Sequence, residues 1–191
     1  MSLIQLTRRV GLVAAAASLT VVLAACGDDE DTEATDPSSD TPAETSDSSA
    51  DGPTPVAPWA PIIETDDADS VTGLDFTDTP EPGTELEVAT VTEGDGPEVE
   101  VGQTLSVNYF GSVYQGEQPF DESYSRGTPV EFPIGVGQLI PGWDQGIPGV
   151  KVGSRIIMSI PSDLGYGDAG SPPTIPGGAT LFFVIDVLDA S

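Results

Sequence analysis

The stretch GVGQLIPGWDQG, residues 135–146, decides the fold that we expect for this chain. It is too short and too rich in glycine for a long helix, but Leu139, Ile140 and Trp143 would share one side of a helix of one or two turns. Pro141 suits the first position of such a helix, because its fixed φ is helix-ready and no N–H donor is needed there. A buried indole at Trp143 would form a broad flat surface with one N–H in need of a partner. The stretch therefore predicts a short helix that supplies the floor of a shallow apolar pocket.

Alternating apolar and polar residues around this stretch predict β-strands. Residues 104–109 alternate cleanly, with Leu105, Val107 and Tyr109 on one face. Further strands are expected at 86–92, 130–134, 156–160 and 181–188, and Pro133 restricts the second of these to an edge or a bulge. No segment from 84 to 191 has the pattern of a helix of three turns. We therefore predict an α+β domain over 84–191, an antiparallel sheet wrapped around one short helix.

The first 25 residues have the pattern of an export signal. Arg8 and Arg9 precede a run of 16 residues without charge, which is short for a membrane span of about 20. Small residues then stand directly before Cys26, the only cysteine of the chain. This arrangement resembles the bacterial lipoprotein signal, in which a diacylglycerol is attached to the cysteine and cleavage leaves that cysteine at the N-terminus. The alternative is an ordinary secretory signal with a cysteine at this position by chance.

Residues 26–58 are predicted to be a disordered acidic linker rich in Ser, Thr and Pro. Between residues 27 and 83 there are 17 acidic and no basic residues, so like-charge repulsion should extend this part of the chain. The acidic run at 28–31 lacks the glycine-centred loop of a calcium site. Residues 59–83 are more apolar and form a partly ordered extension, which either docks on the domain as an N-terminal strand or serves as a loose adhesive patch. The sequence leaves these two alternatives open.

The composition excludes several classes of function. A formal charge of −27 opposes binding to a phosphate backbone, and without histidine the chain has no catalytic triad or imidazole metal ligand. The run GYGDAG at 165–170 matches a dinucleotide fingerprint, but Pro172 and Pro173 follow where that motif needs a helix. We therefore expect no cofactor and no metal.

Six motifs stand in one order along the domain, and they carry a resemblance to a known family. They are VNYFG at 107–111, FDES at 120–123, the stretch at 135–146, VGSR at 152–155, GYG at 165–167 and ATLFF at 179–183. Together they resemble the FKBP-type peptidyl-prolyl cis–trans isomerases over roughly residues 86–188. The resemblance implies a twisted antiparallel sheet of about five strands around a short helix, and an enzyme that isomerises X-Pro bonds.

The resemblance also implies roles for individual residues. Trp143 would be the floor of the substrate pocket, Asp121 a polar group at its edge paired with Arg126, and the Tyr166 hydroxyl and the Ile140 N–H would bind substrate carbonyl groups. The walls would be aromatic and aliphatic: Tyr109, Phe120, Phe132, Phe183, Leu139, Ile140 and Ile175. Val130 and Ser171 depart from the family pattern, which often has an aromatic residue and a histidine there. Alone, the inward-facing aromatic residues would be core in any sheet protein, and it is the order of the motifs that favours a site.

The expected function is a monomeric, membrane-tethered isomerase that acts on exported, proline-containing polypeptides at the outer face of the bacterial cell membrane. Macrolide immunophilin ligands are possible further partners through the resemblance, whereas nucleic acid is not expected. The alternatives are a non-catalytic module on a lipid anchor that binds proline segments, and an inert acidic lipoprotein with an accidental pocket. Because the domain is acidic, substrates with Lys or Arg beside the proline are expected to be preferred.

Overall fold

The structure is a computed structural model that describes residues 55–191. The signal segment, Cys26 and nearly all of the linker predicted at 26–58 therefore lie outside the described residues.

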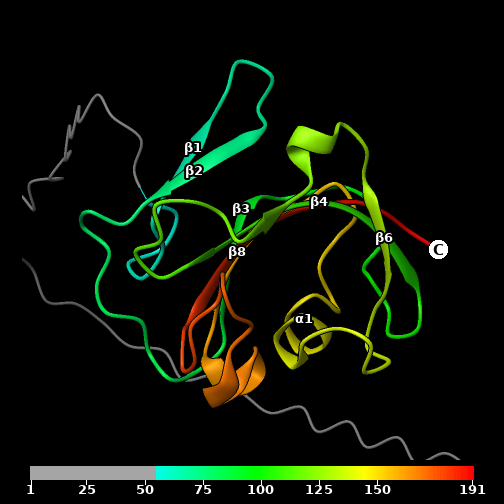
Figure 1. Ribbon diagram of the computed structural model, residues 1–191. Helices are drawn as coiled ribbons and strands as arrows, with labels where there is room; N and C mark the ends of the chain where they lie inside the picture. Colours follow the sequence, from blue (N-terminus) through cyan, green and yellow to red (C-terminus); the bar gives the residue numbers. More distant parts are fainter. Residues whose placement is uncertain (1–54) are drawn as a thin grey trace, which may run out of the picture. The chain divides into compact units, whose positions relative to one another are not determined.

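The main sheet has six strands, and all of their pairings are antiparallel. Its order is β3 (Glu87–Thr92), β7 (Arg155–Ile160), β8 (Leu181–Ala190), β4 (Thr104–Val113) and β5 (Asp121–Glu122). The remaining strand, β6 (Val130–Pro133), also pairs with β4. Figure 1 shows the long strands β4 and β8 curving through the centre of the molecule. The predicted antiparallel sheet is confirmed, and Pro133 does lie on an edge strand, where its missing N–H breaks no second ladder.

One short helix, α1 (Pro141–Gly146), packs against the inner face of the sheet. Pro141 occupies the start of the helix, as predicted, but Leu139 and Ile140 precede the helix instead of sharing its face. The reason is steric: a residue before proline avoids the helical region, and Ile140 has φ −62° and ψ 143°. Gly142 and Gly146 allow a close approach, because a Cβ at either position would collide with Ile160 or Met158 of β7.

The sheet is covered on both faces. Its inner face carries the larger core, formed by buried residues such as Leu105, Val107, Ile156 and Ile185 around Trp143. Its outer face carries Phe110, Ile157 and Val184, which belong to a second core. Such a sheet needs an apolar cover on each side.

The cover of the outer face comes from the N-terminal extension. Strands β1 (Ile62–Thr65) and β2 (Val71–Asp75) pair antiparallel as a separate two-stranded sheet. Ala60, Val71 and Phe76 are buried, and the first two pack in the second core. In Figure 1 this hairpin and α1 lie on opposite sides of the main sheet. The extension therefore docks on the domain, but as a hairpin of its own and not as a strand added to the main sheet.

The remaining helical segments are single 3₁₀ turns: η1 (Tyr124–Arg126), η2 (Ser162–Leu164) and η3 (Gly167–Ala169). None of the helices in the described part of the chain is both long enough and apolar enough to cross a membrane.

Candidate functional site

A cavity of about 640 Å³ lies between α1, the inner face of the sheet, the loop before α1 and the loops on either side of η3. Its volume is within the range of about 300–1,000 Å³ that is usual for small-molecule and cofactor pockets. Ten of the predicted site residues line it: Tyr109, Phe120, Asp121, Phe132, Leu139, Ile140, Trp143, Tyr166, Ile175 and Phe183. The structure thus brings together residues from four strands, one helix and three connections, which are those before β5, before α1 and between β7 and β8.

Trp143 forms the floor, and three aromatic rings stand on it nearly at right angles. The ring planes of Tyr109, Phe132 and Phe183 make angles of 82°, 84° and 85° with the indole, at centroid distances of 5.7, 5.5 and 5.3 Å. Phe120 stands edge-on to Phe183 at 5.4 Å. Edge-to-face contacts of this kind are favourable for aromatic rings and fix their relative orientation. The result is an aromatic box whose rings hold one another in a fixed relative orientation.

The indole N–H of Trp143 is buried and has no hydrogen-bond acceptor among residues 55–191. A buried donor without an acceptor is uncommon in a protein core, because its desolvation is not offset. This observation favours Trp143 as a binding-site residue over the alternative of a plain core residue.

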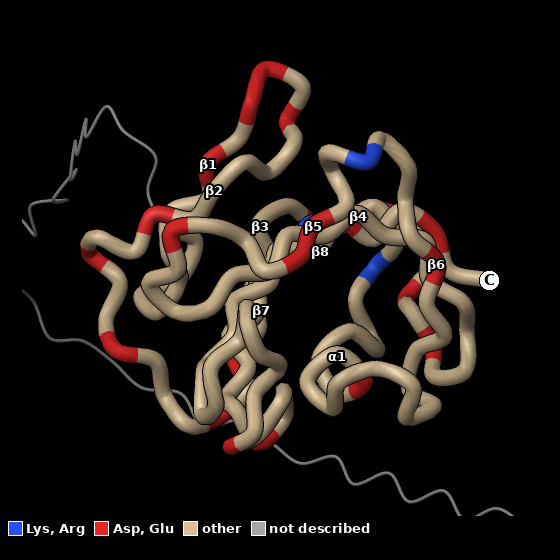
Figure 2. The backbone as a smooth tube through the Cα atoms, in the orientation of Figure 1, with Lys and Arg blue, Asp and Glu red and all other residues tan. Residues whose placement is uncertain are grey.

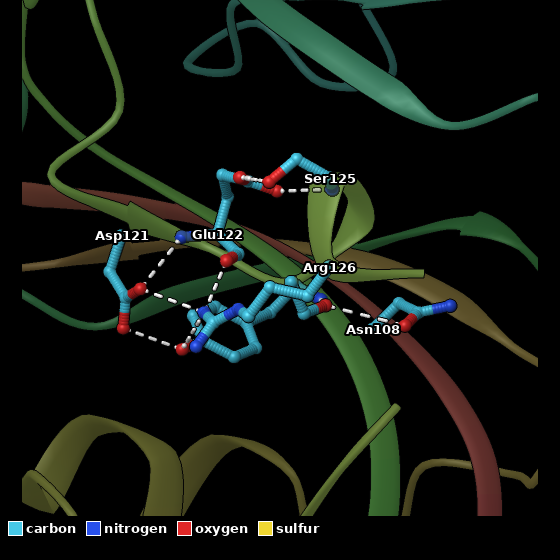
Figure 3. A network of polar contacts seen from close by, with 7 residues as sticks. Asn108, Asp121, Glu122, Ser125 and Arg126 are labelled. Atoms are coloured by element: carbon cyan, nitrogen blue, oxygen red, sulfur yellow. Dashed lines mark hydrogen bonds and ion pairs between the residues drawn. The ribbon is translucent and has the colours of Figure 1, made fainter. Parts of the chain in front are cut away.

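Three side chains form a polar edge at the mouth of the cavity (Figure 3). The Tyr109 hydroxyl donates to the Asp121 carboxylate at 2.5 Å. Arg126 donates through Nη2 to the other carboxylate oxygen of Asp121 at 2.8 Å and to the Tyr109 hydroxyl at 3.0 Å. It also donates to the carbonyl oxygen of Glu122. The Asp121–Arg126 pair expected from the resemblance is therefore present, and Tyr109 joins it as a third member.

The electrostatics of this edge follow from burial and from these contacts. Burial raises the pKa of Tyr109 to about 12, and the hydrogen bond to Asp121 acts in the same direction. The hydroxyl is therefore a proton donor throughout the physiological range. The hydrogen bond to Tyr109 raises the pKa of the Arg126 guanidinium. The side chains of Arg126 and Asp121 remain 47% and 54% exposed, so their charges face a bound molecule and solvent together.

Ser123 is a structural member of the site that sequence reasoning did not single out. It is fully buried, and its Oγ accepts the Tyr109 N–H at 2.9 Å, while its own N–H donates to the Tyr109 carbonyl oxygen at 2.9 Å. The Ser123 hydroxyl donates to the Asn108 side-chain oxygen at 3.3 Å. Ser123 is the last residue of the motif FDES, and its place in that motif was the signal that could have identified it. It ties the segment that carries Asp121 to the strand that carries Tyr109.

Two polar groups at the open side of the cavity could form hydrogen bonds with the backbone of a bound peptide. The Ile140 backbone N–H donates to no backbone acceptor in residues 55–191, since Ile140 precedes the helix. Tyr166 is 40% exposed and lines the cavity from the loop between η2 and η3. Of the two departures from the family pattern, Ser171 does line the cavity, whereas Val130 does not and packs against the core. Gln138, Pro141, Gly165 and Thr174 complete the lining and were not predicted.

The acidic residues expected around the pocket do not all face it. Asp121 lines the cavity, but Asp144 is engaged by the loop before α1, where its carboxylate accepts the Gly135 and Gly137 N–H groups at 2.7 and 2.8 Å. Glu122 accepts hydrogen bonds from the Ser125 N–H and hydroxyl, and the latter lowers the pKa of Glu122. Figure 2 shows acidic residues spread over many parts of the fold and few basic ones. Within residues 55–191 no group of three or more acidic, Cys or His side chains is placed to hold a metal ion.

An antiparallel sheet around one short helix, with an aromatic cavity between them and polar groups at its rim, defines the class of this small domain. Residues 96–188 match the family described as FKBP-type peptidyl-prolyl cis-trans isomerase. The chain belongs to this family, as the following relatives show.

The FK506-binding protein of Streptomyces anulatus is 47% identical over 109 residues, which are 56% of this chain and 88% of that protein. The peptidyl-prolyl cis-trans isomerase FKBP15-1 of Arabidopsis thaliana is 56% identical over 82 residues, 43% of this chain and 53% of that protein. The crystal structure of AtFKBP13 is similar with a TM-score of 0.52 at 37% identity, and the match covers 56% of this chain and 93% of that one. The family match at 96–188 includes strands β4 to β7, most of β8, the helix α1 and every residue that lines the cavity.

Proposed function

We propose that this chain is a lipid-anchored peptidyl-prolyl isomerase that assists the folding of exported proteins at the outer face of the cell membrane. The observation that supports the catalytic part is the aromatic box on Trp143, with Ile140 and Tyr166 at its open side. The observation that supports the location is the sequence before Cys26.

The proposed mechanism needs no nucleophile, metal or cofactor. Rotation about a peptide bond has a barrier of about 18–20 kcal/mol, because the C–N bond has partial double-bond character. The twisted amide has lost this conjugation and much of its dipole. It is therefore better tolerated by an apolar box than the planar ground state, which is a case of stronger binding to the transition state. The prolyl ring occupies the box over Trp143 and is held while the chain on one side of the bond rotates.

The polar groups at the rim then hold the flanking peptide. The Ile140 N–H binds one substrate carbonyl and the Tyr166 hydroxyl a second one, so that the two ends of the rotating bond are held separately. Asp121 and Arg126 supply a charged pair at the edge, with Asp121 facing the cavity. No proton is transferred in this mechanism, which agrees with a chain that has no histidine.

The catalytic roles are tested by substitution at the rim. Asp121→Val and Tyr166→Phe should each lower kcat/KM for a proline peptide by about tenfold, the equivalent of ~1.4 kcal/mol for one polar contact. Trp143→Leu should lose less activity than Trp143→Ala, since it keeps more of the apolar floor. The measurement is a protease-coupled assay of residues 27–191, with circular dichroism to verify the fold. Glu117→Val is the control, because it also replaces an acidic side chain with valine, at an exposed position that does not line the cavity.

Full activity of Asp121→Val with every peptide tried would remove that residue from the mechanism. A wild-type chain that binds proline peptides without accelerating their isomerisation would favour the alternative of a non-catalytic binding module. Since the Streptomyces relative is named for binding FK506, we propose that the same box also takes the apolar ring of a macrolide. Such a ligand should compete with the peptide substrate.

The anchor is tested separately at Cys26. Cys26→Ala should release the protein from the membrane fraction or leave the signal uncleaved, because the thiol is the only attachment point for a diacylglycerol. Two acyl chains suffice for stable anchoring where a single one would be marginal. A wild-type protein found free in the medium, with Cys26 shown by mass spectrometry to be unmodified, would overturn the proposed location and leave the proposed activity untouched.

A further inference from the structure

The polar edge of the pocket depends on a segment that has little structure of its own. Arg126 reaches Asp121 and Tyr109 from η1, which is one 3₁₀ turn with no buried residue. Its backbone is closed by the Arg126 N–H to Ser123 and the Gly127 N–H to Tyr124, at 3.1 and 3.0 Å. A single turn of this kind is not stable by itself, because nucleation of helical structure is unfavourable. Contacts outside the turn must therefore hold it.

Ser125 contacts the neighbouring Glu122, and the contact that ties η1 to the central sheet begins at Tyr124, the first residue of η1. Its hydroxyl donates to the Asp186 carboxylate of β8 at 2.8 Å. Asp186 is held in turn by Arg155 of β7, whose Nε and Nη2 donate to its two oxygens at 2.5 and 2.9 Å. These two side chains are only 17% and 12% exposed. Burial, and next the charge of Asp186, raise the pKa of Tyr124, so its hydroxyl remains a donor.

Arg155 also connects this network to the N-terminal hairpin. Its Nη1 donates to the Asp69 carboxylate at 3.0 Å and its Nη2 to the Asp69 carbonyl oxygen at 2.8 Å. Asp69 lies in the turn between β1 and β2 with φ 62°, and its side chain is 78% exposed. An exposed ion pair of this kind contributes little by itself. The anchor of η1 on the sheet is therefore the partly buried contact between Tyr124 and Asp186.

We propose that Tyr124 is a positioning residue of the isomerase site: its hydroxyl, held by Asp186 and Arg155 on the outer face of the sheet, fixes η1 so that Arg126 meets Asp121 and Tyr109 at the pocket. The inference rests on the proposed function, since it assigns η1 a part in the same reaction. Tyr124 does not line the cavity and acts only through Arg126, two residues further along the same turn. Small displacements of such groups lower catalytic rates strongly.

The test is Tyr124→Phe, which removes one hydroxyl and keeps the ring. Tyr114→Phe is the matched control: the Tyr114 hydroxyl also joins the sheet to the N-terminal extension, by donating to the Thr79 carbonyl oxygen at 3.2 Å, but it lies away from the cavity. We expect kcat/KM to fall about threefold to tenfold in Tyr124→Phe, the range that the loss of one hydrogen bond accounts for, and to stay unchanged in Tyr114→Phe.

A double-mutant cycle separates positioning from a general loss of stability. In a background of Arg126→Ala, the further change Tyr124→Phe should have no effect on kcat/KM, because contacts that act in series are not additive. An equal loss in both backgrounds, or no loss in the wild-type background, would overturn the proposal. Loss of stability alone would lower kcat/KM by the same factor in the wild-type and the Arg126→Ala backgrounds.

Hydrogen exchange gives a readout that does not need activity. The Gly127 N–H closes η1 on the Tyr124 carbonyl oxygen, so it should exchange faster in Tyr124→Phe and at the wild-type rate in Tyr114→Phe. Unchanged exchange in Tyr124→Phe would overturn the proposal even for a fully active enzyme. If the wild-type chain binds proline peptides without isomerising them, the proposed catalysis fails. The cycle is then measured on peptide Kd, and equal Kd values for wild type and Tyr124→Phe would overturn the positioning role.

Discussion

Gly111 shows how closely single residues determine the pocket. It lies on β4 opposite Phe183, and a Cβ at this position would lie 2.7 Å from the Phe183 ring and 2.8 Å from the Phe120 ring. These distances are shorter than real Cβ atoms show, and both rings are walls of the cavity. Glycine at this position therefore allows the two walls to stand where they do.

We predict that Gly111→Ala displaces both rings. The substitution should destabilise the fold by about 1–3 kcal/mol, as overpacking of a core does, and raise KM for a proline peptide. The measurements are urea unfolding and the isomerase assay. Gly83→Ala is the control, since its new Cβ would have only the Glu87 carboxylate, at 4.0 Å, within reach. An unchanged KM in Gly111→Ala would mean that the walls relax without consequence for the substrate.

Tyr109 gives a prediction for alkaline pH. Its pKa is raised from 10.0 to about 12 in the folded protein, mainly by burial. The folded state thus holds this proton more tightly than the unfolded state. The resulting stability is fully present below pH 10 and is lost as the pH rises from 10 to about 12.

We therefore expect the free energy of unfolding of the wild type to fall over this alkaline range, and to fall less steeply in Tyr109→Phe. Urea unfolding at stepped pH measures the difference. Tyr124, whose pKa is also raised by burial, contributes to the wild-type slope, so the comparison should be repeated in Tyr124→Phe. Identical slopes for wild type and Tyr109→Phe would contradict the assignment.

At the scale of elements, the N-terminal extension is the part of the fold for which the structure adds most to the sequence analysis. Phe76 packs edge-on against Phe182 of β8 at 5.1 Å and against Tyr114 at 5.6 Å. Val71 and Ala60 pack in the second core with Phe110. The extension is thus a layer of the domain that covers the outer face of the sheet. An experiment on the isomerase should include it.

We predict that residues 84–191 alone are less stable than residues 55–191 by on the order of 3–5 kcal/mol, because large apolar side chains lose their cover. The shorter chain should bind a hydrophobic dye through the exposed outer face. Denaturant midpoints measure the difference, and Phe76→Ala in the longer chain should reproduce part of it. Val88→Ala serves as a control for the loss of an apolar side chain, because Val88 is already exposed. Equal midpoints for the two lengths would show that the cover contributes no stability.

At the scale of the whole molecule, the main feature is the large net negative charge. Residues 84–191 contain 15 acidic and 3 basic residues, a net −12 that follows from 3 minus 15. Asp144 and Glu122 are counted among these acidic residues, although both are engaged in local hydrogen bonds. A field of one sign over a cleft raises the association rate of oppositely charged ligands by a factor of about 10–10³ at low salt.

We therefore predict that peptides with Lys or Arg beside an apolar pre-proline residue have a higher kcat/KM than matched peptides with Glu or Asp. The preference should shrink with salt, as the Debye length falls from about 30 Å at 0.01 M to about 10 Å at 0.1 M. Matched Lys and Glu peptides at the two salt concentrations measure it. Equal rates at low salt would mean that the acidity serves solubility and not substrate choice.

The sequence by itself determined the class of fold and most of the pocket. Period-two alternation indicated the main strands, and Pro141 with the glycines around it marked a short helix. The order of six motifs indicated the site residues, since each lies on a strand or loop whose position the fold holds constant. The resemblance implied the pairing of Asp121 with Arg126, which stand five positions apart in the sequence.

Only the tertiary structure decided what depends on contacts between distant segments. The apolar residues of the extension did not indicate where it docks. The sequence near them does not show that the outer face of the sheet needs an apolar cover. The link between Arg155 and Asp69 spans 86 residues, and that between Tyr124 and Asp186 spans 62. No spacing rule reaches so far, since such pairs are set by strand order and register. The same holds for Asp144, whose carboxylate turns from the pocket to the loop because two glycine N–H groups lie there without another partner.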